Sequence, residues 1–113
     1  MKFIKNCQWI DGQEYKKRIL IDKLDKKIDL IEDVIVRSKG EIPIHEHDST
    51  DEIFYVTDNS AVIIIEEKKY KINPGDMICV DRKEKHGFLN ESDKPFKMIV
   101  FKLDHVKGDS YLK

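Results

Sequence analysis

Apolar and polar side chains alternate with a period of two along most of the chain, which is the pattern of strands that bury one face. Turn-forming clusters at 58–60, 73–76 and 90–95 interrupt this alternation. The segments of strand length are rich in β-branched and aromatic residues, and they cover 18–24, 34–38, 42–47, 52–57, 61–66, 69–73, 77–81, 86–90 and 96–103. The sequence therefore predicts hairpins in series.

Helical spacing occurs where Leu24, Ile28 and Ile31 recur at intervals of three and four residues. The same residues fit two strand ends around 25–27, and we favour the strand. Many short strands without a helical run predict an all-β fold. Because an antiparallel sandwich or a closed barrel hides its sheet edges, one of these two architectures is expected.

The length of the chain limits its organisation. A chain of 113 residues is the size of one domain, so we expect a single domain over 1–113. Accessory strands are expected in residues 1–30, as part of the same body. The polar tail over 104–113 is expected to be loosely held.

Charge and hydropathy narrow the class of partner. The 21 Lys and Arg residues nearly balance the 22 Asp and Glu residues, which indicates neither nucleic acid nor an anionic membrane as a partner. The longest apolar run, 61–65, is far shorter than the ~20 residues of a membrane span. The N-terminus lacks the apolar core of a signal peptide. A cytoplasmic protein is expected, in which Cys7 and Cys79 are reduced packing residues.

The residues that can do chemistry include His45-Glu46-His47. On a strand, residues i and i+2 project from the same face, so both imidazoles can reach a common ion. Glu52 opens the following apolar strand, and His86 begins a later one and offers a third imidazole. These residues are candidates for a metal site. The alternative from spacing alone is a solvated polar segment, which is common for a His-x-His pair in charged sequence.

The run Gly40-Glu41-Ile42-Pro43-Ile44-His45-Glu46-His47, followed after four residues by Glu52, resembles the first signature of the cupin superfamily. The spacer from Gly40 to His45 is one residue shorter than the usual form. Asn59 stands where the family has a glycine. Because asparagine also adopts a positive φ, the turn is expected to form.

The run Pro74-Gly75-Asp76-Met77-Ile78-Cys79-Val80-Asp81, followed by His86 and then Asn90, resembles the second cupin signature. Asp81 and Lys83 replace the proline and glycine that usually stand in the turn before the histidine. The matching segments are 40–59 and 74–90. The resemblance implies a double-stranded β-helix, or jelly-roll barrel, of the RmlC-like type.

The resemblance also implies, position by position, a metal site formed by His45, His47, Glu52 and His86. Asp51 would fit a shorter version of the spacing. Its parity places it on the opposite strand face, so we favour Glu52.

Phe54, Phe88 and Asn90 share strand faces with these ligands and are candidates for a substrate pocket. The alternative for the two phenylalanines is packing inside the barrel. The alternative for Asn90 is a hydrogen bond across strands.

Three imidazoles and one carboxylate suit iron, manganese, cobalt, nickel or zinc as a divalent ion. An octahedral ion would keep two positions open, whereas four protein ligands would close a tetrahedral zinc site. The resemblance implies a metal-dependent enzyme acting on a small polar metabolite, as a dioxygenase, decarboxylase, isomerase or lyase. The alternative is a non-catalytic module that binds a metal or a metabolite. A small-molecule ligand and a homodimer are expected by analogy, and exposed sheet edges also favour pairing.

Overall fold

The computed structural model describes residues 1–5 and 7–112, and these residues form strands and turns. The strands are β1 (Lys2–Ile4), β2 (Ile10–Asp11), β3 (Lys16–Lys17), β4 (Ile28–Val36), β5 (Glu41–His47), β6 (Asp51–Asp58), β7 (Ala61–Ile65), β8 (Lys68–Ile72), β9 (Met77–Val80), β10 (His86–Leu89), β11 (Phe96–Leu103) and β12 (Ser110–Leu112). None of the described residues belongs to a helix that could cross a membrane.

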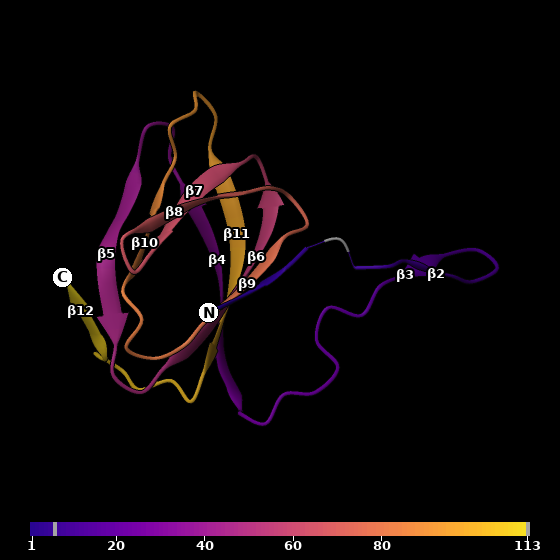
Figure 1. The fold of residues 1–113 in the computed structure, drawn as a ribbon, viewed down its shortest axis with the longest axis horizontal. Coiled ribbons are helices and arrows are strands. Elements are labelled where there is room, and N and C mark those ends of the chain that lie inside the picture. The colour runs from indigo at the N-terminus through magenta and orange to yellow at the C-terminus, as the bar shows by residue number, and fades with distance from the viewer. Residues whose placement is uncertain (6, 113) are drawn as a thin grey trace.

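Two five-stranded antiparallel sheets form the body of the protein (Figure 1). One has the strand order β1-β9-β6-β11-β4, and the other has the order β12-β5-β10-β7-β8. From β4 to β7, and again from β8 to β12, consecutive strands lie in opposite sheets. This alternation produces a jelly roll, so the predicted all-β fold is confirmed. The short hairpin of β2 and β3 projects away from this body at the right of Figure 1.

The space between the two sheets is filled by apolar side chains, because alternation turns every second residue of a strand inward. Phe54 and Val56 on β6 are buried in one cluster with Ile63 on β7 and Phe88 on β10, which belong to the other sheet. Burial of a side chain of this size contributes about 1.5–3 kcal/mol. This core fixes the relative position of the strands that carry the polar candidates.

The strands predicted between residues 34 and 103 are all observed, with shifted ends, and the ambiguous segment after residue 27 is the strand β4. The strand predicted over 18–24 is wrong. Leu20 and Ile21 both pack against a second apolar cluster that includes Ile53, whereas Ile19 is 55% exposed. Two successive side chains cannot be buried on one face of a paired strand, so packing overrides the β-propensity of this segment.

The N-terminal segment contributes to the structure in two ways. β1 pairs with β9 at the edge of the first sheet. After the projecting hairpin, the Arg18 guanidinium donates a hydrogen bond to the Gly75 carbonyl at 2.9 Å and stacks on the Trp9 ring, with 4.9 Å to its centroid. Cys7 and Cys79 are free thiols packed at the second apolar cluster.

The prediction of a loosely held tail is wrong. β12 pairs with β5, with Ser110 opposite His47 in the register. The Asp109 carboxylate accepts hydrogen bonds from the backbone N–H groups of Asp48, Ser49 and Thr50 and from the hydroxyls of the last two. The tail therefore provides hydrogen-bond partners for the backbone N–H groups of the turn between β5 and β6. Local sequence patterns do not reveal this contact, because its partners lie far apart in the chain.

Asp109→Asn should lower the free energy of unfolding by about 2 kcal/mol at neutral pH. Burial raises the pKa of Asp109, but the hydrogen bonds from Ser49, Thr50 and Asp48 outweigh it and lower the pKa to about 2. Because the pKa is lower in the folded state, this stabilisation is complete above about pH 4 and is lost as the pH falls through about 2. Urea unfolding of both proteins at several pH values measures it, with the exposed Asp93→Asn as control. A difference that stays constant down to pH 2 would contradict this assignment.

Candidate metal centre

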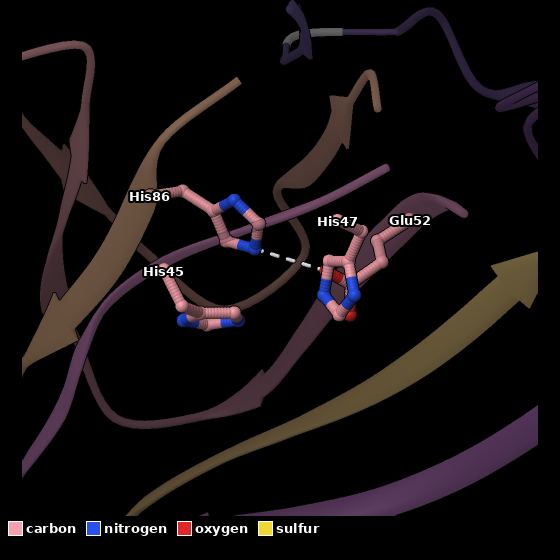
Figure 2. A group of neighbouring side chains, drawn as sticks. All are labelled: His45, His47, Glu52 and His86. Carbon is pink, nitrogen blue, oxygen red and sulfur yellow. Dashed lines mark hydrogen bonds and ion pairs between the residues drawn. The ribbon is translucent and has the colours of Figure 1, made fainter. Parts of the chain in front are cut away.

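Four polar side chains, contributed by strands of both sheets, converge on one another (Figure 2). His45 and His47 lie on β5, His86 lies on β10 of the same sheet, and Glu52 lies on β6 of the opposite sheet. Each residue offers one ligand atom, and these atoms all lie within 4.8 Å of one another. The period-two alternation brings both β5 histidines inward, and the register pairs His86 with His45.

The position of His86 depends on an irregularity in β10. The register with β5 shifts between His86 and Phe88, as in a β-bulge. A Cβ atom at the intervening Gly87 would lie 2.7 Å from the Ile42 carbonyl oxygen, which is too close for any other residue. Gly87 thus permits the close approach that presents His86 to the cluster.

Burial separates the cluster into a closed side and an open side. His47, Glu52 and His86 are buried, with exposed fractions of 4%, 5% and 1%. His45 is half-buried. A small molecule would therefore reach the cluster past His45.

Backbone carbonyls fix the tautomers of two histidines. Nδ1 of His45 lies 2.8 Å from the Pro43 carbonyl oxygen, and Nδ1 of His86 lies 2.9 Å from the Glu84 carbonyl oxygen. Because a carbonyl can only accept, each Nδ1 carries the proton and donates it. In the neutral imidazole, Nε2 then presents a lone pair to the cluster, which is the usual arrangement around a metal-binding histidine.

The Glu52 carboxylate lies among these nitrogens. Its Oε1 atom is 2.9 Å from Nε2 of His86, from which it accepts a hydrogen bond when that nitrogen carries a proton, and 2.8 Å from Nε2 of His47. The contact with His47 lacks hydrogen-bond geometry, and among the residues that the structure describes neither ring nitrogen of His47 has a hydrogen-bond partner. A buried polar atom without a partner costs about 1–3 kcal/mol. A divalent cation would satisfy the nitrogen of His47 together with the Glu52 carboxylate and the other imidazoles of the cluster. The residues present therefore fit a metal ion.

The protonation states of Glu52 and His45 also favour a metal ion. Burial raises the pKa of Glu52, but contacts with His47 and His86 outweigh it, so the pKa lies well below its ordinary value. Burial lowers the pKa of His45, and the nearby His86 and His47 add to this, although the Pro43 carbonyl and Glu52 oppose it. An ionised carboxylate and a neutral imidazole are the forms that bind metal ions.

The neighbouring Asp51 points out of the cluster, as its parity predicts. Its Oδ1 atom accepts hydrogen bonds from the Arg82 backbone N–H at 2.7 Å and from Arg82 Nε at 3.2 Å, and Oδ2 pairs with Lys26. The backbone N–H of Lys83 donates to the His47 carbonyl, and Lys83 itself has φ of 68°. Asp51 thus ties the turn before His86 to the strand that carries Glu52.

Asn59 has φ of 65°, so it occupies the left-handed conformation expected where the family has a glycine. Lys83 adopts the same conformation at the second position that usually holds glycine. Positive φ is costly for a lysine. The contact of its N–H with the His47 carbonyl offsets part of this cost.

A cavity of about 150 Å³, named the barrel cavity below, opens beside His45 and Glu52. Phe54 and Phe88 line it. The structure does not bring Asn90 into this lining: its side-chain N–H groups donate to the Val36, Arg37 and Lys94 carbonyls, and its Oδ1 accepts from Ser92. The full lining is Glu32, Val34, Ile42, His45, Glu52, Phe54, Phe88, Met98, Val100 and Lys102.

Two charged residues of this lining, Glu32 and Lys102, were not identified from the sequence. A signal was present for Lys102, which shares its parity on β11 with the buried Met98 and Val100. A lysine in phase with inward-facing apolar residues is unusual unless it has a role in the interior.

The chain spans 18% and 45% of the lengths of two curated relatives that it matches. The first is the dynein regulatory complex subunit 2 of Macaca fascicularis, which is 30% identical over 88 residues, or 78% of this chain. The second is an uncharacterized protein of Methanocaldococcus jannaschii, which is 25% identical over 56 residues, or 50% of this chain.

Solved structures share the fold. The DMSP lyase DddQ of Ruegeria pomeroyi superposes with a TM-score of 0.66 at 20% identity and covers 74% of this chain and 42% of its own. A predicted oxalate decarboxylase of Thermotoga maritima gives 0.64 at 21% identity, over 68% of this chain and 67% of its own. A double-stranded β-helix protein of Klebsiella pneumoniae gives 0.67 at 17% identity, over 77% of this chain and 81% of its own.

The match to a protein family is consistent with this fold and with the position of the four clustered side chains. Residues 33–102 match the family described as the cupin domain, and this range contains β5, β6 and β10 with the whole cluster. The chain therefore belongs to the cupin family.

Proposed function

We propose that the protein binds one divalent transition metal ion through His45, His47, Glu52 and His86, and that it acts on a small polar metabolite in the barrel cavity. The observation that carries the proposal is the buried His47 ring, which lies beside the Glu52 carboxylate and whose nitrogens find no hydrogen-bond partner within residues 1–5 and 7–112. Iron, manganese, cobalt, nickel and zinc all suit this donor set. Once bound, such an ion polarises a carbonyl or carboxylate oxygen of its ligand.

The other residues of the cavity would position the metabolite. Half-buried His45 leaves one side of the cluster open, and Phe54 and Phe88 supply apolar walls that exclude water. The names of two solved relatives, a lyase and a predicted decarboxylase, support an enzyme. A non-catalytic metal-binding module is the alternative, and four-coordinate zinc in the purified protein would favour it.

We also propose a cytoplasmic homodimer that has no nucleic acid or membrane partner. The balanced charge supports the absence of such partners. The dimer is supported by β4, a nine-residue strand at the edge of the first sheet. Ile31 and Ile35 on its outer face are 61% and 60% exposed, and acidic Asp29 and Asp33 share that face. A second copy packed against this mixed face would cover Ile31 and Ile35.

Metal binding tests the ligand assignment. His45→Ala and Glu52→Gln should each reduce bound cobalt from about one ion per chain to less than 0.1, because each removes a donor from a four-ligand site. Elemental analysis after dialysis measures the ion, and circular dichroism checks the fold. The matched controls His105→Ala and Glu41→Gln remove the same residue types outside the cluster and should retain the metal. Equal metal content in all variants would exclude this site.

Removal of the metal tests its contribution to stability. An ion present at a hundred times its dissociation constant stabilises the native state by about 2.7 kcal/mol, which corresponds to roughly 10 °C in Tm for a domain of this size. Thermal unfolding with and without a chelator measures the shift. Glu52→Gln should show no such shift. An identical Tm after verified removal of the metal from the wild type would reject a stabilising role.

The oligomeric state tests the β4 interface. Light scattering should give the mass of a dimer for the wild type and of a monomer for the double variant with Ile31→Lys and Ile35→Lys, because two charges would have to be buried at the interface. The matched control Ile19→Lys alters a similarly exposed residue on the N-terminal segment. A wild-type monomer, or a double variant that remains dimeric, would contradict the interface.

A further inference from the structure

We propose that Lys102 determines specificity at this site, and that the site takes a short organic acid with two carboxylate groups, one at the metal cluster and one paired with Lys102. This inference rests on the proposed metal site and names the substrate class for it. The three observations behind it are the register of Lys102 with Glu52, the size and lining of the barrel cavity, and the loose ion pair of Lys102 with Glu32.

The register places Lys102 beside the cluster. On the ladder between β6 and β11, Lys102 is directly opposite Glu52. The Cβ atoms of such a pair are typically about 4.5–5.5 Å apart, on the same face of the sheet. Glu52 faces the interior, so Lys102 does too, and its side chain is only 17% exposed. The cationic side chain of Lys102 on β11 therefore lies next to Glu52, the cluster residue on the neighbouring strand β6.

The barrel cavity limits the size of the ligand. Its volume of about 150 Å³ is similar to that of a protein cavity that accommodates a molecule the size of benzene. Its walls between the charged groups are apolar and include Val34, Phe54 and Val100. These features suit a short hydrocarbon chain with a polar group at each end, one toward His45 and Glu52 and the other toward Lys102.

The ammonium group of Lys102 can accept an anion. Among the described residues its ionic partner is Glu32, at 3.4 Å, and the Glu32 side chain is 41% exposed. A lysine has three donors, and one long contact at the rim leaves donors for a ligand. A divalent ion, the Glu52 carboxylate and the Lys102 ammonium together carry two positive charges, which matches two carboxylates once Glu32 turns to solvent.

Calorimetric titration of the cobalt-loaded protein with succinate and with butyrate tests this inference. The wild type should bind succinate about ten- to a hundredfold more tightly than butyrate, the range for a charged hydrogen bond. Lys102→Met should abolish that preference and Lys102→Arg should retain it. Glu32→Gln should tighten succinate binding, because it removes the competing carboxylate. The control Lys97→Met, on the outward face of the same strand, should bind like the wild type.

Cobalt content is measured in every sample, so the two proposals fail in different ways. A cobalt-loaded wild type that binds succinate no better than butyrate overturns the inference and leaves the metal site intact. Equal succinate affinity in the wild type and in folded, cobalt-loaded Lys102→Met also overturns it. A wild type that takes up no cobalt overturns the metal site and the inference together.

Discussion

The Glu52 carboxylate is buried against the imidazoles of His47 and His86, and the rest of the site depends on this contact. Glu52 belongs to one sheet and the histidines to the other, so the cluster exists only when the apolar core holds both sheets together. An unpaired buried charge costs several kcal/mol. The barrel therefore stabilises the site through its packing, and a cation bound there would in turn hold the two sheets together.

Two further carboxylates support this contact without belonging to the cluster. Asp51 holds the turn before His86 through Arg82, and Asp109 holds the turn between His47 and Glu52. Both have a pKa lowered to about 2, because the hydrogen bonds that they accept outweigh their burial. The loops that join the strands of the cluster are thus fixed by ionised groups on the outer side of the barrel.

Much of this arrangement follows from local sequence. Period-two alternation predicts which of His45, Glu46 and His47 share a face, and it separates Glu52 from Asp51. The predictions of a strand over 18–24 and of a loosely held tail over 104–113 are wrong because both segments depend on partners far along the chain. Residues 20 and 21 pack against the second apolar cluster at Ile53, and the tail binds the turn after His47. The proximity of Lys102 to Glu52 likewise requires the register of β6 with β11, which no local pattern contains.

Anomalous diffraction from a crystal of the cobalt-loaded protein tests most directly whether one ion lies between the two sheets. We expect one strong peak bounded by Nε2 of His45, His47 and His86 and by the Glu52 carboxylate, at about 2.0–2.2 Å from each, as for other transition-metal sites. A cobalt-loaded crystal whose peak lies elsewhere, or whose four side chains remain in contact with no ion between them, would contradict this expectation.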